Sequence, residues 1–309
     1  MSSTWSASAS LRFSQRGGIT RHQGGASAPL KLMRAFPQAS GHCELPLLHT
    51  AGGLVGGDRL QLDVDLDRGS RALITSVAAQ KVYGSVRRSR CHPEGRWAEQ
   101  QVRVGLEAGS DLEWLPQELV LYADALYQQH LQVNLAEEAS FLAMEVVRLG
   151  RTAAGEGLGA GCWRSSLQIR RQASHHAPAR WELVDRLQLG ADGLADAHGM
   201  AGQPVFGSLV WAAPQDLEPE VLQQLLSEAR SARSGLEGTM ACGALDQGLI
   251  ARYRGPSSQA ARFWFCRLWA LIRQARGQEP PQLPRVWPFQ ENPWPMGTAI
   301  PSDPANCST

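Results

Sequence analysis

The sequence predicts a β-rich α+β fold with two α-helices near the C-terminus, and three patterns lead to this class. Short runs of alternating apolar and polar residues recur from residue 60 to residue 189. Turns that contain glycine separate these runs, and no helical pattern lies between them. After about residue 214 the apolar residues instead repeat every three to four positions. Together these patterns favour a sandwich or coil of many short strands that carries two helices.

The first clear strand pattern is LQLDVDLD at residues 60–67. Its leucines and valine fall on one face and its aspartates on the other, which is typical of a strand with one buried face. The stretch FLAMEVVRL at 141–149 is apolar on both faces, so we expect this strand to be buried on both sides. Further strands are expected at 71–77, 102–106, 131–135, 167–169, 181–189 and 248–255.

Two helices follow this strand-rich part. The segment 219–235 has Pro219 in the position of a first helical turn and an apolar stripe that ends before Gly235. The segment 257–277 begins at Ser257, a suitable N-cap, and ends at Gly277. We therefore expect both helices to pack an apolar face against the body of strands.

The composition is that of a folded globular protein. The 309 residues are 43% hydrophobic and 19% charged, and the formal net charge of +1 argues against a dedicated nucleic-acid-binding protein. No stretch is long and apolar enough to cross a membrane, and residues 1–18 lack the apolar core of a signal peptide. The six cysteines are far apart and form no C-x-x-C pair. The expected location is therefore the cytoplasm, where thiols stay reduced.

The chain shows no clean linker, so we expect one main domain. Residues 1–28 are rich in Ser, Gly and Ala, which predicts a flexible N-terminal segment. The single domain is then expected at 29–290. The remaining residues, 291–309, are expected to be a flexible C-terminal tail.

Several patterns resemble known binding motifs but lack features that those motifs require. The glycine-rich segment 52–58 has no GK[ST] ending and leads into a strand, so it indicates a turn rather than a phosphate loop. The aspartates in 63–67 resemble the start of a calcium loop but alternate with apolar residues, which favours a solvated strand face. Three adjacent pairs involve histidine (His42-Cys43, Cys91-His92 and His175-His176), and neighbours on a strand chelate a metal poorly because they point to opposite faces.

Carboxylates on apolar strand faces are the more informative signal. Glu145 shares a face with Phe141 and Ala143, and Asp185 shares one with Leu183 and Leu187. A carboxylate in such a place is costly unless it is paired, neutralised or facing water. Two interpretations remain open: an internal ion pair with an arginine, or an internal polar passage lined by carboxylates.

A glycosidase is the alternative from a different functional class. Glu113 and Glu118 flank the sequence WLPQ and could form the carboxylate pair of a β-helical carbohydrate-active enzyme. That chemistry depends on the distance between the two carboxyl groups, which a sequence does not give.

Several ordered motifs resemble those of the UreD/UreH family of urease accessory proteins. They are APLKLMRAFP, LPLLHTAGGLVGGDRL, WLPQELVLY, MEVVRLGRTAAGE and FCRLWALIRQARGQEPPQLPRVW, which together run from about residue 29 to residue 287. The sequence departs from the family pattern at Thr50-Ala51, which replaces Pro-Pro, and at Gln80, Gly84 and Tyr122. Because of these departures, the family pattern says less about the local role of residues 80–84, but it still indicates the same family.

The resemblance implies a β-helix-like coil of strands that carries two α-helices. It implies a non-catalytic scaffold that binds UreF, which binds the GTPase UreG, and that docks with them on the urease apoprotein. Nickel, supplied through UreE, is then expected to reach the urease active site by way of an internal tunnel. GTP hydrolysis belongs to UreG, no tightly bound cofactor is expected, and neither nucleic acid nor membrane is an expected partner.

Nickel(II) accepts carboxylate, imidazole and water ligands, and a transit path must bind it weakly enough to release it. We therefore expect four carboxylates to line or guard the passage: Asp58, Glu145, Glu156 and Asp185. The first three lie in the matched motifs, and Asp185 is selected by strand parity alone. Tryptophan is a frequent interface anchor, so a partner surface is expected on the C-terminal helices and tail at Trp264, Trp269, Trp287 and Trp294, although at least half of these are expected to be core.

Overall fold

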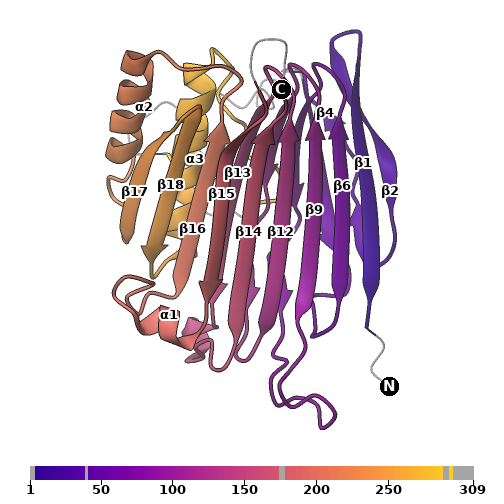
Figure 1. The fold of residues 1–309 in the computed structure, drawn as a ribbon, viewed down its shortest axis with the longest axis vertical. Helices are drawn as coiled ribbons and strands as arrows, with labels where there is room; N and C mark the ends of the chain where they lie inside the picture. The colour runs from indigo at the N-terminus through magenta and orange to yellow at the C-terminus, as the bar shows by residue number, and fades with distance from the viewer. Residues whose placement is uncertain (1–3, 39–40, 174–177, 288–291, 295–309) are drawn as a thin grey trace, which may run out of the picture.

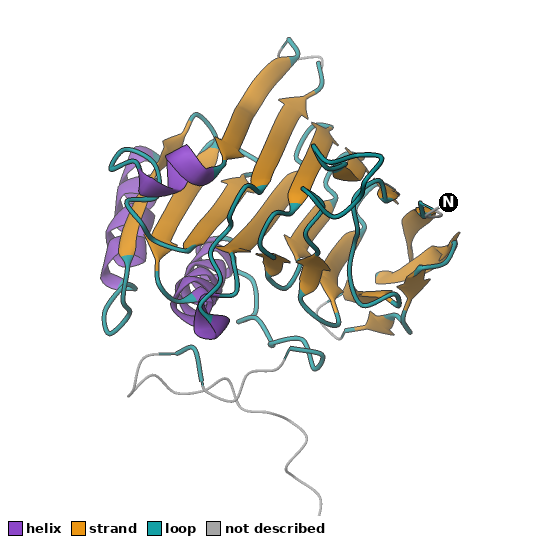
Figure 2. Ribbon diagram, turned by 90° about the horizontal axis from the view of Figure 1, so that it is seen from below, coloured by secondary structure: helices purple, strands orange, loops and turns teal. Residues whose placement is uncertain are grey.

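The computed structural model of the chain describes residues 4–38, 41–173, 178–287 and 292–294. The strands form two large β-sheets that face each other, with helices gathered beyond one of them (Figure 1). Figure 2 shows the same arrangement from below, with the two longer helices at one side of the strands. The predicted β-rich α+β class is confirmed. No helix among the described residues is both long enough and apolar enough to span a bilayer.

Seven strands form the first sheet, which we call sheet A. Its five central strands run parallel to one another, and an antiparallel strand closes each end. In spatial order the strands are β15 (Arg180–Leu189), β14 (Cys162–Arg171), β12 (Leu126–Leu135), β9 (Ala98–Leu106), β6 (Arg59–Leu66), β1 (Ser6–Arg16) and β2 (Ile19–Ala26).

The second sheet, sheet B, contains eleven strands. Along its main path they are β17 (Thr239–Leu245), β18 (Gly248–Gly255), β16 (Val205–Ala212), β13 (Ser140–Leu149), β10 (Asp111–Leu115), β7 (Arg71–Ser76), β5 (His42–His49) and β3 (Leu30–Leu32). Three short strands pair beside this path: β4 (Phe36–Pro37), β8 (Gln80–Val82) and β11 (Leu119–Leu121).

The chain crosses between the sheets at almost every step from β5 to β14. Strands β6, β9, β12 and β14 lie side by side in sheet A, while the intervening β7, β10 and β13 lie in sheet B. Neighbouring strands within each sheet are parallel in this region. This winding is the β-helix-like coil that the family resemblance implied.

The register of the coil stacks apolar side chains into rows. In sheet A one row joins five residues that are at most 2% exposed: Leu11, Val64, Val104, Val133 and Ile169. The opposing row in sheet B includes Leu45, Ile74, Trp114 and Ala143. Because side chains alternate between faces, these rows meet between the sheets and form the larger of the two apolar cores.

Strand β13 is buried on both faces, as its sequence predicts. Phe141, Ala143 and Val147 belong to the core between the sheets. Leu142 and Met144 belong to a second core between sheet B and the helices. Glu145 therefore projects to the inside of the sandwich, toward sheet A, from a strand that has no solvent-facing side.

The two predicted C-terminal helices are present, together with the short helix α1 (Ala191–Ala195). Helix α2 (Pro219–Ser231) begins at Pro219 and ends four residues before Gly235, the residue expected to follow it. Helix α3 (Ser258–Ala275) is capped by the side chain of Ser257, which accepts a hydrogen bond from the backbone N–H of Ala260. Both helix starts agree with the sequence signals.

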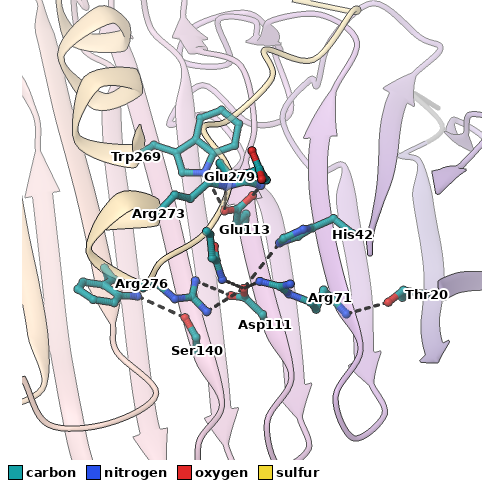
Figure 3. A network of polar contacts seen from close by, with 12 residues as sticks. Thr20, His42, Arg71, Asp111, Glu113, Ser140, Trp269, Arg273, Arg276 and Glu279 are labelled. Carbon is teal, nitrogen blue, oxygen red and sulfur yellow. Dashed lines mark hydrogen bonds and ion pairs between the residues drawn. The ribbon is translucent and has the colours of Figure 1, made fainter. Parts of the chain in front are cut away.

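Buried ion pairs fasten α3 to strand β10. Asp111 and Glu113 lie on the helix-facing side of β10, where they are 2% and 1% exposed. Arg273 donates to both carboxylate oxygens of Glu113, at 2.7 and 2.6 Å, and Arg276 donates to both oxygens of Asp111, at 3.1 and 2.8 Å. The indole N–H of Trp269 also donates to Glu113 (Figure 3). These contacts fix the helix in one position on the sheet.

The expectation of a flexible N-terminal segment at 1–28 is wrong for residues 6–26, which form β1 and β2. Strand β1 pairs in parallel with β6 over eight residue pairs, from Ser6↔Arg59 to Phe13↔Leu66. Its alternate residues Ala7, Ala9, Leu11 and Phe13 are all buried. The serines between them obscured an ordinary period-two strand.

The expectation that at least half of the four C-terminal tryptophans belong to the core is confirmed, and the three buried ones are not available for the expected partner surface. Trp264, Trp269 and Trp287 are 0%, 1% and 7% exposed, because they fill the core between α3 and sheet B. A buried tryptophan does not anchor a partner without local unfolding. Most of the expected flexible tail at 291–309 lies outside the described residues.

The pairing of Glu113 with Arg273 predicts a large and mutually dependent effect on stability. Arg273→Met should lower the free energy of unfolding by about 3–5 kcal/mol, because it leaves a buried carboxylate without its charge partner. The double variant Glu113→Gln, Arg273→Met should recover part of this loss. Urea unfolding of the unmodified chain, the two single variants and the double variant measures the coupling free energy between the two side chains.

The exposed pair Arg12–Asp67, whose arginine side chain is 65% exposed, provides the control cycle. Its coupling should be much smaller than that of the buried pair, because solvent screens the two exposed charges. If the Glu113–Arg273 coupling were no larger than that of the surface pair, the ion pairs would not be what fastens α3.

Candidate functional site

Two adjoining cavities lie between sheets A and B. The inner cavity has a volume of about 110 Å³ and the outer one about 370 Å³. Both are bounded by Gln80, Gln100, Trp114, Pro116 and Gln117, so a single layer of side chains separates them. The sandwich thus contains two neighbouring cavities whose walls are largely apolar and carry a few polar side chains.

The inner cavity collects polar side chains from five neighbouring strands. They are Gln129 of β12, Glu145 of β13, Ser165 of β14, Asp185 of β15 and Ser208 of β16. The amide of Gln129 donates to the carboxylate of Glu145 and, at 3.2 Å, to the hydroxyl of Ser165. Sequence positions 129 to 208 thus meet at one place because the coil brings successive strands back to it.

Glu145 has an unusual protonation equilibrium. Burial raises its pKa to about 7, and the nearby charge of Asp185 acts in the same direction. The hydrogen bond from Gln129 and the positive charge of Arg252 oppose this rise without cancelling it. The side chain therefore keeps its proton to a higher pH than an ordinary glutamate does.

Asp185 is paired with an arginine from sheet B. Arg252 on β18 donates to Asp185 Oδ2 at 2.5 Å and also donates to the hydroxyl of Ser208. The two charged side chains are 30% and 20% exposed, respectively. Of the two interpretations from the sequence, the internal ion pair is present at Asp185, and the carboxylate also lies at the inner cavity.

Asp58 and Glu156 do not join this group. Asp58 is 4% exposed and accepts hydrogen bonds from the backbone N–H groups of Trp5, at 3.0 Å, and Val55, at 2.9 Å, so it holds the turn that precedes β6. Glu156 pairs with Arg151 at the protein surface, with an Nε–Oε2 distance of 2.8 Å. Neither carboxylate lines the two cavities.

The glycine-rich segment forms the turn that the sequence indicates. Gly57 has φ = 99°, and a Cβ at Gly56 would lie 2.7 Å from the backbone oxygen of Arg96. Glycine is therefore required at both positions, for backbone conformation and for close approach. Gly52 and Gly53 line the outer cavity next to His49.

His49 is a polar residue of the outer cavity that the sequence did not single out. Its ring lines the cavity, and both of its nitrogens are shielded from solvent without a hydrogen-bond partner among the described residues. Burial lowers the pKa of His49, while the negative charge of Asp58 acts in the opposite direction. The imidazole is therefore favoured in its neutral form, in which it has a lone pair available.

The glycosidase alternative finds no support in the geometry. Both carboxylate oxygens of Glu113 are bonded to Arg273, and Glu118 accepts a hydrogen bond from Arg262 at 2.8 Å. Neither glutamate lines the cavities between the sheets. A catalytic pair must face the same cleft, so these residues serve instead to hold α3.

Within the described ranges, no three His, Cys, Asp or Glu side chains come close enough to hold a metal ion together. His42, from the first adjacent pair, lies 3.7 Å from Asp111 in the network beneath α3. His175 and His176 fall outside the described residues. The site is thus a largely apolar cavity into which a few carboxylate, amide and hydroxyl groups project.

The fold and its interior define a class of protein in which the polar side chains gather inside a closed coil of strands. A family model, the UreD urease accessory protein, matches residues 6–288. The chain therefore belongs to the UreD urease accessory protein family, as the motifs indicated.

Cyanobacterial relatives share most of this sequence. A urease accessory protein UreD from Synechococcus sp. (strain WH7805) is 60% identical over 309 residues, which cover 96% of this chain and 97% of the relative. The protein of the same name from Parasynechococcus marenigrum (strain WH8102) is 62% identical and covers 94% of this chain and 92% of its own length. That from Prochlorococcus marinus (strain MIT 9313) is 59% identical, with 88% and 85% covered.

The raised pKa of Glu145 predicts a pH-dependent contribution to stability. Between its ordinary pKa of 4.5 and its raised pKa of about 7, the folded chain retains a proton on Glu145 that the unfolded chain has lost. The stability that this group contributes is therefore full below about pH 4.5 and is lost as the pH rises through 7, by up to about 3 kcal/mol.

Glu145→Gln should remove this dependence because the amide does not titrate. Urea unfolding at about pH 5 and about pH 8 should show the variant gaining stability relative to the unmodified chain at the higher pH only. An equal difference between the two proteins at both pH values would show that Glu145 titrates normally.

Proposed function

We propose that this chain is a non-catalytic scaffold of urease maturation that guides nickel toward the active site of the urease apoprotein. It acts in the cytoplasm in a complex with UreF and the GTPase UreG, and nickel reaches that complex through UreE. GTP hydrolysis belongs to UreG. The chain itself needs no tightly bound cofactor, and neither nucleic acid nor membrane takes part.

The pair of adjoining cavities between the sheets is the observation that supports this proposal. Nickel(II) binds carboxylate, imidazole, amide and water oxygen or nitrogen atoms. The inner cavity offers Glu145 and Asp185, and the outer cavity offers His49. These donors are spaced along the hollow region instead of gathered in one tight cluster, which suits an ion that must bind briefly and move on.

The four expected passage residues take different roles in this proposal. Glu145 and Asp185 contact the passing ion in the inner cavity. Asp58 acts indirectly, because it holds the turn beside the outer cavity and places a negative charge near His49. Glu156 lies outside the route and pairs with Arg151 at the surface.

The names of the relatives agree with a role that supports another protein. Each is described as a urease accessory protein. Among the described residues, the hydroxyls of Ser165 and Ser208 in the inner cavity accept hydrogen bonds from Gln129 and Arg252, and not from a histidine that could activate them for covalent catalysis. The cavity chemistry is that of weak binding.

The test is nickel-dependent activation of urease apoprotein by the purified accessory complex. Glu145→Ala and Asp185→Ala should each lower the yield of active urease by about tenfold, since each removes an anionic donor from the inner cavity. The complex with UreF and UreG should still assemble, which size-exclusion chromatography checks.

Glu156→Ala is the matched control, because it removes a carboxylate of the same family motifs that faces the outside. It should activate urease to within about twofold of the unmodified chain. Normal activation by the Glu145 and Asp185 variants in fully assembled complexes would refute the passage.

A further inference from the structure

A third cavity lies on the outside of the sandwich, where sheet B extends beyond the last strand of sheet A. It has a volume of about 350 Å³. Its walls come from β15, β16, β17 and β18 and from the segment 198–200. We call it the outer groove. Leu187, Leu189 and Phe206 give it an apolar floor, and Arg252 and Arg254 add positive charge.

Arg252 stands on the boundary between the outer groove and the inner cavity. Its own side chain lines the groove. Its two hydrogen-bond partners, Asp185 and Ser208, line the inner cavity instead. Arg252 thereby links β18 to β15, two strands that are distant in the sequence. This link lies where the outer groove and the inner cavity approach each other.

The arginine is held firmly but remains movable. Its guanidinium lies 5.6 Å from the centre of the Phe206 ring, which also lines the groove. The side chain is 30% exposed, so it borders solvent on the groove side. A swing of its flexible stem into the groove would break its hydrogen bonds to Asp185 and Ser208.

The positive charge of Arg252 disfavours the binding of a cation in the inner cavity. The guanidinium lowers the pKa of Glu145 as well as pairing with Asp185, so it acts on both carboxylates of the inner cavity. Arginine does not lose its proton in proteins. A divalent cation at these carboxylates therefore competes with the guanidinium for the same negative charge, and the two repel each other.

We propose that Arg252 is a displaceable gate: it closes the inner cavity against the outer groove, and a divalent metal ion at Glu145 and Asp185 drives it outward into the groove. This inference rests on the proposed function, since it concerns the same passing ion. Binding of the ion in the inner cavity thus itself opens the connection to the outer groove. Arg252 is a positioning and gating residue that does not contact the ion itself.

The test is direct titration of the purified full-length chain with nickel(II) by isothermal calorimetry. Arg252→Met keeps the length of the side chain but removes the competing charge. It should bind nickel about tenfold more tightly than the unmodified chain, because the carboxylates no longer have a built-in counter-ion. The gain should vanish when Glu145→Gln is added to Arg252→Met.

Arg254→Met is the matched control. Arg254 lies two residues further on the same strand and lines the same groove, but it donates to the backbone oxygens of Ala197 and Gly199. Its replacement should leave nickel affinity unchanged. Arg252→Lys retains the charge and should bind nickel with nearly the affinity of the unmodified chain, which guards against an effect of misfolding in Arg252→Met.

The outcomes separate the gate from the passage. If Arg252→Met binds no more tightly than the unmodified chain, while Glu145→Gln weakens binding, the gate is refuted and the passage stands. If Glu145→Gln and Asp185→Asn leave nickel affinity unchanged in both backgrounds, the passage is refuted and the gate with it. Tighter binding in both Arg252→Met and Arg254→Met would show a general charge effect and would also refute the gate.

Discussion

Sheet B lies between sheet A on one side and the helices on the other, so each charged side chain at its centre must find a partner inside the protein. On the helix side, Asp111 and Glu113 are satisfied by arginines of α3. On the side facing sheet A, Glu145 is satisfied by Gln129 and influenced by Arg252. The position of α3 and the chemistry of the inner cavity both follow from this double burial.

The two sides of sheet B solve the problem in different ways. Beneath α3, burial alone raises the pKa of Asp111, but the charge and hydrogen bonds of Arg276, aided by His42, hold the pKa far below its usual range. In the inner cavity the compensation is incomplete, and the pKa of Glu145 remains near 7. The fully paired carboxylates fasten the structure, whereas the incompletely paired Glu145 keeps a raised pKa.

Much of the fold could be predicted from the sequence because strand and helix periods are local properties. The burial of β13 on both faces and the inward direction of Glu145 and Asp185 followed from parity alone. Strand β1 was missed because its small alternating residues, Ala7 and Ala9, sit in a Ser-rich stretch that also suits a tail. Its partner β6 lies about fifty residues away, and local composition does not encode that pairing.

The site was harder to predict because it is made by long-range contacts. Arg252 meets Asp185 across 67 residues of sequence, and only the topology of the two sheets brings them together. Motif membership was a weaker guide than strand parity: Asp58 and Glu156 lie in matched motifs yet serve a turn and a surface pair. His49 lay in a motif too, but nothing in the sequence distinguished a cavity-lining imidazole from a core one.

The most direct measurement is a crystal structure of the accessory complex soaked in nickel(II), with anomalous diffraction recorded at the nickel absorption edge. If nickel passes through the inner cavity, we expect an anomalous peak inside the sandwich, between Glu145 and Asp185. This peak should be absent in a Glu145→Gln crystal treated in the same way. Nickel peaks confined to the surface of the protein, with none between the two sheets, would contradict it.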